Sequence, residues 1–514
     1  MTPARCFAPL PLLALFLLAG CPEERPEAVV RPPPRPPQAM LSAGAQNQPD
    51  VLTVARPSGP EWFGIYLGGR KVGWTKSQLA TELRDGRNVL VLRSEMLMRV
   101  NVAGKTVERT QSEERVYEAR PGGRLLSFRA AFGGDGGDRV VTGTCSSRER
   151  CTAAIDAPGG GREERTLEGV TETADLADGV RLAAARRTVV RGRQIEFMKL
   201  RVRDQEDAFA RRERVAGAGV QAEVSVVEER EIGDRMPVVY RVADDGRVVD
   251  VSYGNAIVSR PETEERAKTL DTVDLFALGR VALPRALPRT VPAAITYQIE
   301  GLPPAFDRAS PRQKVVRDAK GGPALLTVTA RAPAAADPAK DTPLARAKDG
   351  ARPEDLAATA EVDADAPAVQ RLARETAGNA PGAYAAAKLL AARVYRTLEK
   401  AYGASHDRAS DVLAAGKGDC TEHAVLTVAL ARALGIPARQ VYGLVYARYE
   451  DGQDALYWHA WVEVRSAGEW IDVDPIFDQT VADATHVALG SGSQVDVVGL
   501  LGSLKVTGVE VKER

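Results

Sequence analysis

Cys420 is the residue in this 514-residue chain whose surroundings best suit covalent chemistry. It follows a glycine turn in GKGDCTEHAVL (residues 416–426) and opens an apolar run that predicts a buried helix, stopped by Gly435 and Pro437. At a helix start, unpaired backbone amides and the helix dipole favour a thiolate over a thiol. Because free cysteine is also a common packing residue, this position predicts either a nucleophile or a buried filler.

A cysteine nucleophile needs a base and an acid that orients the base. In LYWHAWVEV (456–464) the alternation places His459 on one face of a predicted strand, and in EWIDVDP (469–475) Asp474 lies on one face of the next. If residues 465–468 form the hairpin loop, His459 and Asp474 face each other across the ladder. A slip of one residue would turn the two side chains to opposite faces.

Sulfur, imidazole and carboxylate in this order can open an amide. The imidazole takes the thiol proton, and the aspartate fixes the imidazole tautomer and stabilises its charge. The thiolate then attacks an amide carbonyl and forms a thioester. An amine that attacks the thioester completes a transamidation, whereas water completes a deamidation or a peptide cleavage.

These segments resemble the motifs of the transglutaminase-like superfamily: GDCTEHA (418–424), RALGIPAR (432–439), HAWVE (459–463), and Trp470 with Asp474-Pro475. The resemblance implies an α+β papain-like, transglutaminase-like domain at 356–514. A chain of this length predicts a multi-domain protein, and a β-rich antiparallel domain is expected N-terminal to the transglutaminase-like one. The resemblance also implies that Cys420 is the nucleophile, His459 the base and Asp474 the orienting acid. A peptidase or deamidase on the same triad is the alternative activity.

The oxyanion site departs from the family pattern. Animal transglutaminases use an upstream tryptophan there, and this chain has no tryptophan between Trp74 and Trp458. The Cys420 amide and an unnamed second donor would have to hold the oxyanion, and one lost donor typically costs about 100-fold to 1000-fold in rate. A non-catalytic envelope protein with a binding or structural role therefore stays open as an alternative function.

Other polar residues near the motifs have simpler interpretations. Asp472 shares the predicted face of Asp474 and is the second candidate for the acid. Cys420, His423, His459 and Asp474 could form a zinc site, but Cys420 would then be a ligand instead of a nucleophile. Trp461 and Trp470 are expected to roof the site or fill the core, and His406 and His486 receive no role. We expect no cofactor, no metal and no calcium dependence, because the chain lacks acidic residues at calcium-loop spacing.

The amino terminus predicts export. Residues 1–20 carry one cation and then FAPLPLLALFLLAG, which suits a secretory signal that includes Cys6. The segment ends in LAGC and resembles the lipobox of bacterial lipoproteins, which implies cleavage and lipid attachment at Cys21; an ordinary signal peptide is the alternative. Lipid attachment implies a protein anchored to a bacterial membrane on its extracytoplasmic side. The Pro-rich residues 21–60 read as an extended tether.

Residues 61–300 read as a β-rich domain, a sandwich or a strongly curved sheet, because short alternating runs are separated by turn signals. PVVYRVADDGRVVDVSY (237–253) predicts a hairpin and residues 206–215 a helical interruption. Cys145 and Cys151, separated by five residues, favour a disulfide in an oxidising compartment over two free thiols or a metal site. Residues 301–355 read as a linker or a loosely ordered segment.

The charge composition argues against nucleic acid as a partner. Cationic and anionic side chains number 69 each, and no basic patch is interleaved with aromatics. The expected partners are a protein or peptide substrate and, through the lipid, a membrane. The sequence does not fix an oligomeric state.

Overall fold

The computed structural model of this protein describes residues 48–513 except 103, 135–137, 157–161, 199, 218–219, 319–320, 402–407, 449–453 and 493–494. The expected signal segment, Cys21, most of the tether and His406 lie outside the described residues. Among the residues that are described, no helix is long and apolar enough to cross a bilayer.

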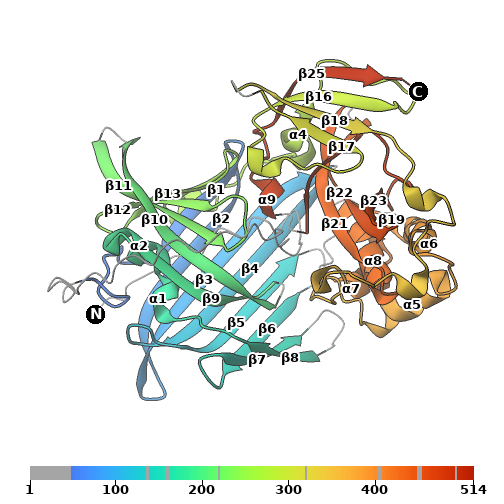
Figure 1. The fold of residues 1–514 in the computed structure, drawn as a ribbon. Helices are drawn as coiled ribbons and strands as arrows, with labels where there is room; N and C mark the ends of the chain where they lie inside the picture. The colour runs from blue at the N-terminus through green and yellow to red at the C-terminus, as the bar shows by residue number, and fades with distance from the viewer. Residues whose placement is uncertain are drawn as a thin grey trace, which may run out of the picture.

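A 14-stranded antiparallel sheet forms the first half of the described chain (Figure 1). The strands lie in the order β8-β7-β6-β5-β4-β3-β2-β1-β14-β13-β12-β11-β10-β9, so neighbours in sequence are mostly neighbours in space. Their bounds are β1 (Glu61–Leu67), β2 (Arg70–Arg84), β3 (Arg87–Val102), β4 (Lys105–Glu118), β5 (Leu125–Gly134), β6 (Arg139–Cys145), β7 (Arg150–Asp156), β8 (Arg162–Glu168), β9 (Val189–Glu196), β10 (Arg201–Gly217), β11 (Val220–Glu231), β12 (Val238–Ala243), β13 (Val248–Tyr253) and β14 (Ile257–Glu262).

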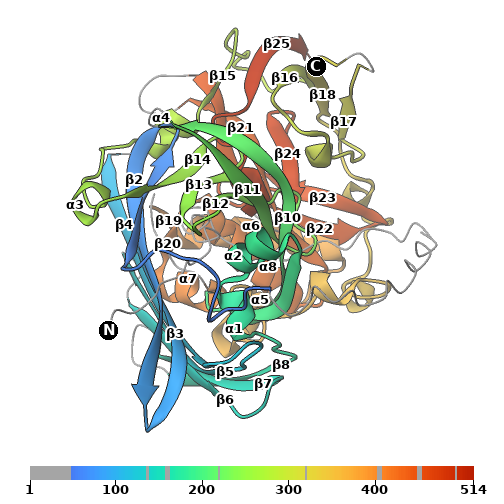
Figure 2. The ribbon, with the colours of Figure 1, turned by 90° about the vertical axis from the view of Figure 1, so that its left-hand side faces the viewer.

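The sheet curls around two short helices, α1 (Ala174–Ala177) and α2 (Gly179–Arg186), as Figure 2 shows. In β3 the alternation decides which face is buried: Leu90 and Leu92 lie in the main core with α2, whereas Val89 and Val91 pack on the opposite face. The predicted strongly curved antiparallel sheet is therefore confirmed.

Two local predictions for this domain have opposite outcomes. The hairpin predicted at 237–253 is formed by β12 and β13, with Gly246 at a φ of 80° in the turn. The helix predicted at 206–215 is wrong, because these residues belong to β10, which pairs with both β9 and β11. The charged run suits a helix locally, but pairing on both sides overrides that propensity.

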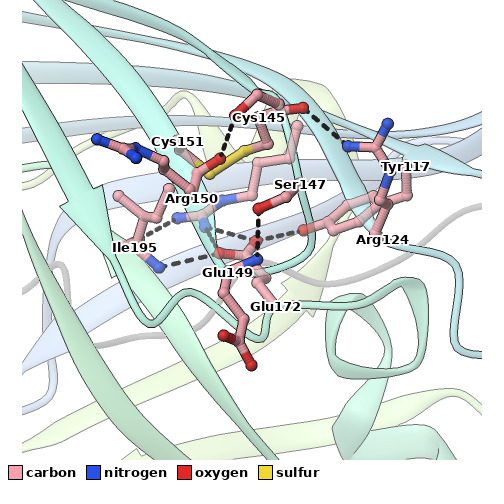
Figure 3. Close-up of a disulfide and its surroundings, with 11 residues drawn as sticks. Tyr117, Arg124, Cys145, Ser147, Glu149, Arg150, Cys151, Glu172 and Ile195 are labelled. Carbon is pink, nitrogen blue, oxygen red and sulfur yellow. Dashed lines mark hydrogen bonds and ion pairs between the residues drawn. A yellow bond between two sulfur atoms is a disulfide. The ribbon is translucent and has the colours of Figure 1, made fainter.

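The disulfide between Cys145 and Cys151 is present and joins directly opposed residues of β6 and β7 (Figure 3). Arg124 Nη1 donates a hydrogen bond of 2.8 Å to the Cys145 carbonyl. Close by, the buried Glu172 accepts hydrogen bonds from the Tyr117 hydroxyl (2.6 Å) and the Ile195 amide (2.9 Å). The predicted bridge across a hairpin neck is thus confirmed.

The second half of the chain holds a helical layer on a five-stranded sheet, whose order is β15-β22-β21-β24 with β23 also on β22. The helix α8 begins at Cys420 and packs on β21 and β22, in agreement with the predicted buried helix. A short parallel pair, β19 (Glu399–Lys400) with β20 (Lys417–Gly418), holds the chain just before Cys420. The remaining elements are α3 (Glu264–Ala267), α4 (Leu275–Gly279), β15 (Val281–Ala282), α5 (Pro367–Ala377), α6 (Ala383–Thr397), α7 (Ala409–Ala415), α8 (Cys420–Ala433), β21 (Ala438–Arg448), β22 (Asp454–Ser466), β23 (Glu469–Val473), β24 (His486–Ser491) and α9 (Val495–Val498).

A third, four-stranded sheet joins segments far apart in sequence: β17 (Gln313–Val316), β18 (Ala324–Thr329), β16 (Ala294–Glu300) and β25 (Lys505–Lys512). Leu326 and Val328 of β18 are fully buried. Residues 301–355 are therefore not a loosely ordered linker, because they contain two of these strands and four short 3₁₀ turns: η3 (Pro304–Phe306), η4 (Ala334–Ala336), η5 (Leu344–Arg346) and η6 (Pro353–Asp355).

The predicted domain boundaries also differ at two other places. The large sheet ends at Glu262, not near residue 300, since β15 and β16 pair within the other two sheets. At the amino-terminal side, Val51 and Val54 lie within the predicted tether but are buried in the core of the large sheet. The hydrophobic effect buries apolar side chains that lie next to a core, even when their neighbours in sequence are typical of a linker.

Candidate active site

Cys420 occupies the first turn of α8, and a capping box fixes that turn. The Asp419 side chain accepts the Thr421 amide at 2.9 Å, and Glu422 Oε2 accepts the Asp419 amide at 2.9 Å. Gly418 is required here, because a Cβ at this position would lie 2.3 Å from the Glu422 Cβ. The glycine turn before the cysteine therefore allows the close approach that closes the cap.

The surroundings of Cys420 favour the thiol over the thiolate. Burial of the sulfur raises its pKa well above the usual value, and the nearby carboxylates of Asp419 and Glu422 raise it further, although a hydrogen bond from the Ala460 amide lowers it. The expected bias of the helix start toward a thiolate is therefore outweighed. The helix dipole is a small effect next to desolvation and several nearby acids. The Ala460 bond also brings the sulfur to the residue that follows His459.

His459 and Asp474 are in contact, but not through the predicted register. In the structure Ser466 pairs with Glu469, and the turn consists of Ala467 and Gly468, both at positive φ. The predicted four-residue loop is wrong, because this tight turn matches the twist of the two strands. The register differs from the predicted one by two residues, so each side chain stays on its predicted face of the strand. The chain just after β23 still brings Asp474 Oδ2 to 2.7 Å from His459 Nε2.

Asp474 is a fully buried carboxylate with four hydrogen-bond donors around it. Oδ1 accepts the amides of Ile476 (2.8 Å) and Phe477 (3.1 Å), and Oδ2 accepts His459 Nε2 and His486 Nε2 (3.0 Å). Burial alone would raise the pKa of Asp474, but the charges and hydrogen bonds of the two histidines hold it well below its usual range. The carboxylate is therefore ionised and orients both rings.

His486 is the residue of the site that sequence analysis missed. It begins β24, is fully buried, and bridges Asp474 and Asp483, with its Nδ1 3.3 Å from Asp483 Oδ1. Burial by itself would lower the pKa of His486, but the two carboxylates raise it above its usual value. The available signal was a lone histidine in the apolar strand HVALGS, three residues after an aspartate.

Asp472 plays a different part from Asp474. It accepts the indole of Trp461 at 2.7 Å and pairs with Arg312 at 3.3 Å. Trp461 is fully buried, and Trp470 stacks against the guanidinium of Arg439 at 4.1 Å. Trp461 also lies beside the ring of His459, with centroids 5.9 Å apart, and Asp472 holds it in place.

One exposed aromatic side chain flanks the site. The Phe477 residue is 44% exposed, although its amide is held by Asp474, and its ring centroid lies 5.1 Å from that of His459. An exposed aromatic beside His459 gives this site an apolar contact surface.

The four residues that the sequence offered as a zinc site, Cys420, His423, His459 and Asp474, do not all come together. Among the described residues, the cluster of ligand-type atoms lying within 4.8 Å of one another consists of His459, Asp474 and His486, without Cys420 or His423. His423 instead places Nδ1 2.7 Å from the Asp419 carbonyl. The oxygens of Asp474 are satisfied by four hydrogen bonds, so we assign the cluster to a hydrogen-bonded relay.

Residues 370–475, which include Cys420, His459 and Asp474, match the family model of the transglutaminase-like superfamily. The C-terminal region therefore carries a transglutaminase-like domain. No curated protein matches the chain.

Three solved structures resemble parts of the chain. A candidate cysteine protease from Cytophaga hutchinsonii is 18% identical over 43% of this chain and 85% of its own, with a TM-score of 0.28. The periplasmic domain of TgpA from Pseudomonas aeruginosa is 19% identical over 39% and 73%, with a TM-score of 0.21. A candidate protease from Parabacteroides distasonis is 12% identical over 76% and 69%, with a TM-score of 0.19.

Proposed function

Because the C-terminal region carries a transglutaminase-like domain, we propose that this protein is a cysteine acyltransferase that opens an amide of a protein or peptide through a thioester on Cys420. The observation that carries the proposal is the 2.7 Å contact between His459 Nε2 and Asp474 Oδ2, beside the strand amide that bonds to Cys420. Asp474 is the orienting acid and His459 the base.

The proposed reaction starts from the Cys420 thiol and the form of His459 that has a free lone pair. A carboxylate only accepts hydrogen bonds, so the proton of neutral His459 sits on Nε2, facing Asp474, and Nδ1 keeps its lone pair. As the Cys420 sulfur bonds to the amide carbon, Nδ1 takes the thiol proton and the carbonyl oxygen becomes an oxyanion. The C–N bond then breaks, and His459 returns the proton to the leaving nitrogen, which leaves a thioester.

The second half of the reaction reverses these roles. His459 takes a proton from an incoming amine, the amine attacks the thioester carbon, and the sulfur leaves and regains a proton. The Cys420 amide is our candidate oxyanion donor, because the capping box engages the amides on both sides of it, at Asp419 and Thr421.

The enzyme is further proposed to be exported and lipid-anchored through Cys21. The signal-like residues 1–20 and the LAGC segment support this assignment. The disulfide between Cys145 and Cys151 supports it independently, because such bridges persist in oxidising compartments. A Cys21→Ser variant that remains in the membrane fraction of the cell after washing would contradict the lipid anchor.

The activity is tested with a fluorescent amine and glutamine-containing peptides, while ammonia release and peptide cleavage are followed in parallel. We expect amine incorporation together with a Cys420 adduct whose mass is that of the acyl group, and loss of both in Cys420→Ser. Ammonia release or peptide cleavage without incorporation would assign the triad to a deamidase or a peptidase instead. Absence of all three reactions, with no adduct on Cys420, would overturn the enzymatic function and leave a binding protein.

A further inference from the structure

His486 lies between two carboxylates contributed by different segments. Its Nε2 is 3.0 Å from Asp474 Oδ2, and its Nδ1 is 3.3 Å from Asp483 Oδ1. The residue is fully buried, as is Asp474, so water competes little for either bond. The domain match ends at residue 475, so neither His486 nor Asp483 falls within it.

These two contacts favour one protonation state of the ring. An ionised carboxylate can only accept a hydrogen bond, so a ring nitrogen that faces one is best satisfied when it carries a proton. Both nitrogens of His486 face a carboxylate, which favours an imidazolium. Asp483 is itself held as an anion, because it also accepts the Thr485 amide at 2.8 Å and Gln479 Nε2 at 2.9 Å.

The charges around His486 come from four separate elements. Arg312, which precedes β17, donates to the Asp483 carbonyl and pairs with Asp472 at 3.3 Å. It therefore holds the Asp483 backbone and the Asp472 side chain, and neither contact is to the His486 ring. The titratable groups that contact or flank the ring are Asp474, Asp483 and His459 on β22. Arg312, its partner Asp472 and the Tyr297 hydroxyl on β16 lie one step further out, around Asp483. The two carboxylates in direct contact dominate this set.

We propose that His486 is a positioning residue: as an imidazolium held between Asp474 and Asp483, it takes part of the Asp474 charge away from His459. This inference rests on the proposed triad and deepens it. The ring centroids of His459 and His486 are 5.8 Å apart, so the positive charge of one disfavours a positive charge on the other. The charge on His486 therefore favours the neutral form of His459, which is the form that can take a proton from the Cys420 thiol.

The sign of the effect distinguishes this role from simple packing. His486→Gln keeps a donor toward Asp474 but removes the charge. The full Asp474 charge then stabilises a protonated His459, so the proton is retained to higher pH. A purely structural His486 would change stability or the maximal rate and leave the pH midpoint in place.

The first test reads the protonation state directly. The chain has four histidines, so ¹⁵N-imidazole NMR resolves them, and single substitutions assign each signal. In the Cys420→Ala protein, which cannot turn over, we expect both His486 nitrogens to be protonated at about pH 7.5, above the usual histidine pKa of about 6.5. An unprotonated His486 nitrogen at that pH would overturn the proposal. In Asp483→Asn, His486 should lose its proton at lower pH. An unchanged titration of His486 in that variant would also overturn the proposal.

The second test follows iodoacetamide alkylation of Cys420 from about pH 5 to about pH 10, a range that spans histidine and thiol titration. In His486→Gln we expect the acid midpoint to rise by roughly one to two pH units, the size of a unit charge about 6 Å away in a partly screened site. His423→Gln is the matched control, because burial lowers the pKa of His423 and keeps that ring neutral. A midpoint in His486→Gln within about 0.3 unit of the wild type would overturn the proposal.

The same measurement separates this inference from the proposed function. If His459→Gln leaves Cys420 alkylation unchanged at every pH, the triad itself fails. If His459→Gln slows alkylation but His486→Gln leaves its midpoint in place, the triad stands and the role of His486 fails. Circular dichroism and thermal unfolding verify that each variant is folded, and Asp483→Asn tests the proposal with His486 intact.

Discussion

Asp474 is the residue on which the geometry of the site depends most. Its oxygens orient His459 and His486 and also accept the amides of Ile476 and Phe477, so one carboxylate fixes two rings and the loop beyond β23. A buried charge of this kind is tolerable only because every lone pair finds a donor. Changes at this position should therefore disturb the orientation of both rings.

Asp474→Asn should lower kcat for amide turnover by about 1000-fold to 10000-fold, because an amide nitrogen facing His459 favours the wrong imidazole tautomer. Steady-state kinetics measure this loss. Asp472→Asn is the matched control: this residue faces the Trp461 indole, and we expect less than about 10-fold loss there. Equal losses in the two variants would contradict the assignment of the acid.

At the scale of elements, the segment that leads into the third sheet contacts the residues that surround the candidate site. Gln313, the first residue of β17, donates to the Ala488 carbonyl at 2.7 Å and accepts the Ala488 amide at 2.9 Å, so β17 is fastened to β24. Arg312 adds its pair with Asp472. The segment expected to be a linker is thus what keeps the strand of His486 in place.

Arg312→Ala should reduce the free energy of unfolding by about 3 to 5 kcal/mol, because it leaves the buried Asp472 without its charge partner. Urea denaturation measures the change. Lys314→Ala, at an exposed position of β17, should change it by less than about 0.5 kcal/mol. A loss in Arg312→Ala no larger than that of the control would show that the sheet does not clamp the site.

A second element-scale feature is a carboxylate pair in the large sheet. Asp207 on β10 and Glu229 on β11 are directly opposed and buried. Burial raises the pKa of Glu229 to about 7, although Arg203 lowers it, and burial and Glu229 raise that of Asp207 well above its usual value. The folded pair therefore holds a proton that the unfolded chain releases at lower pH.

Stability should consequently fall as pH rises from about 4.5 through about 7, since the folded state binds more protons than the unfolded state in that window. Glu229→Gln should flatten the fall by as much as roughly 3 kcal/mol, measured by urea denaturation at several pH values. Glu223→Gln, at an exposed position of the same strand, is the control. If the unfolding free energy of Glu229→Gln changed with pH as steeply as that of the wild type, the raised pKa of Glu229 would be contradicted.

At the scale of the whole molecule, the segment around α9 joins the two halves. Val498 and Leu501 lie in the core of the large sheet, whereas Val497 and Leu500 lie in the core of the transglutaminase-like domain. Residues next to each other in sequence thus belong to different cores. The last strand, β25, then continues into the third sheet.

Gly254→Ala should loosen this junction, because a Cβ there would lie 1.9 Å from the Gly499 carbonyl oxygen. Gly86→Ala is the matched control, since Gly86 also has a positive φ but faces open space. Strain alone should cost about 1 to 2 kcal/mol in both variants, and only Gly254→Ala should cost more and expose residues near 499 to limited proteolysis. If Gly254→Ala and Gly86→Ala had equal free energies of unfolding, the close contact between residues 254 and 499 would not contribute to stability.

The sequence alone predicted much of the site and part of the fold. Motif spacing pointed to Cys420, His459 and Asp474 on a helix and two successive strands. Alternation predicted the large sheet, and the spacing of two cysteines in an oxidising compartment predicted the disulfide. The sequence did not predict β10, whose charged run is locally helical, or the strands at 313–329, whose partner β25 lies far along the chain. Short-range patterns do not report on pairing between distant segments.

What the sequence determined by itself was the identity and order of the residues proposed for the triad, because residue type and strand parity are local properties. What only the tertiary structure decided was their protonation and support: the raised pKa of the Cys420 thiol, the second ring on Asp474, and the clamp from Arg312. These depend on burial and on charges brought together from distant segments, and electrostatic interactions act through space regardless of separation along the chain.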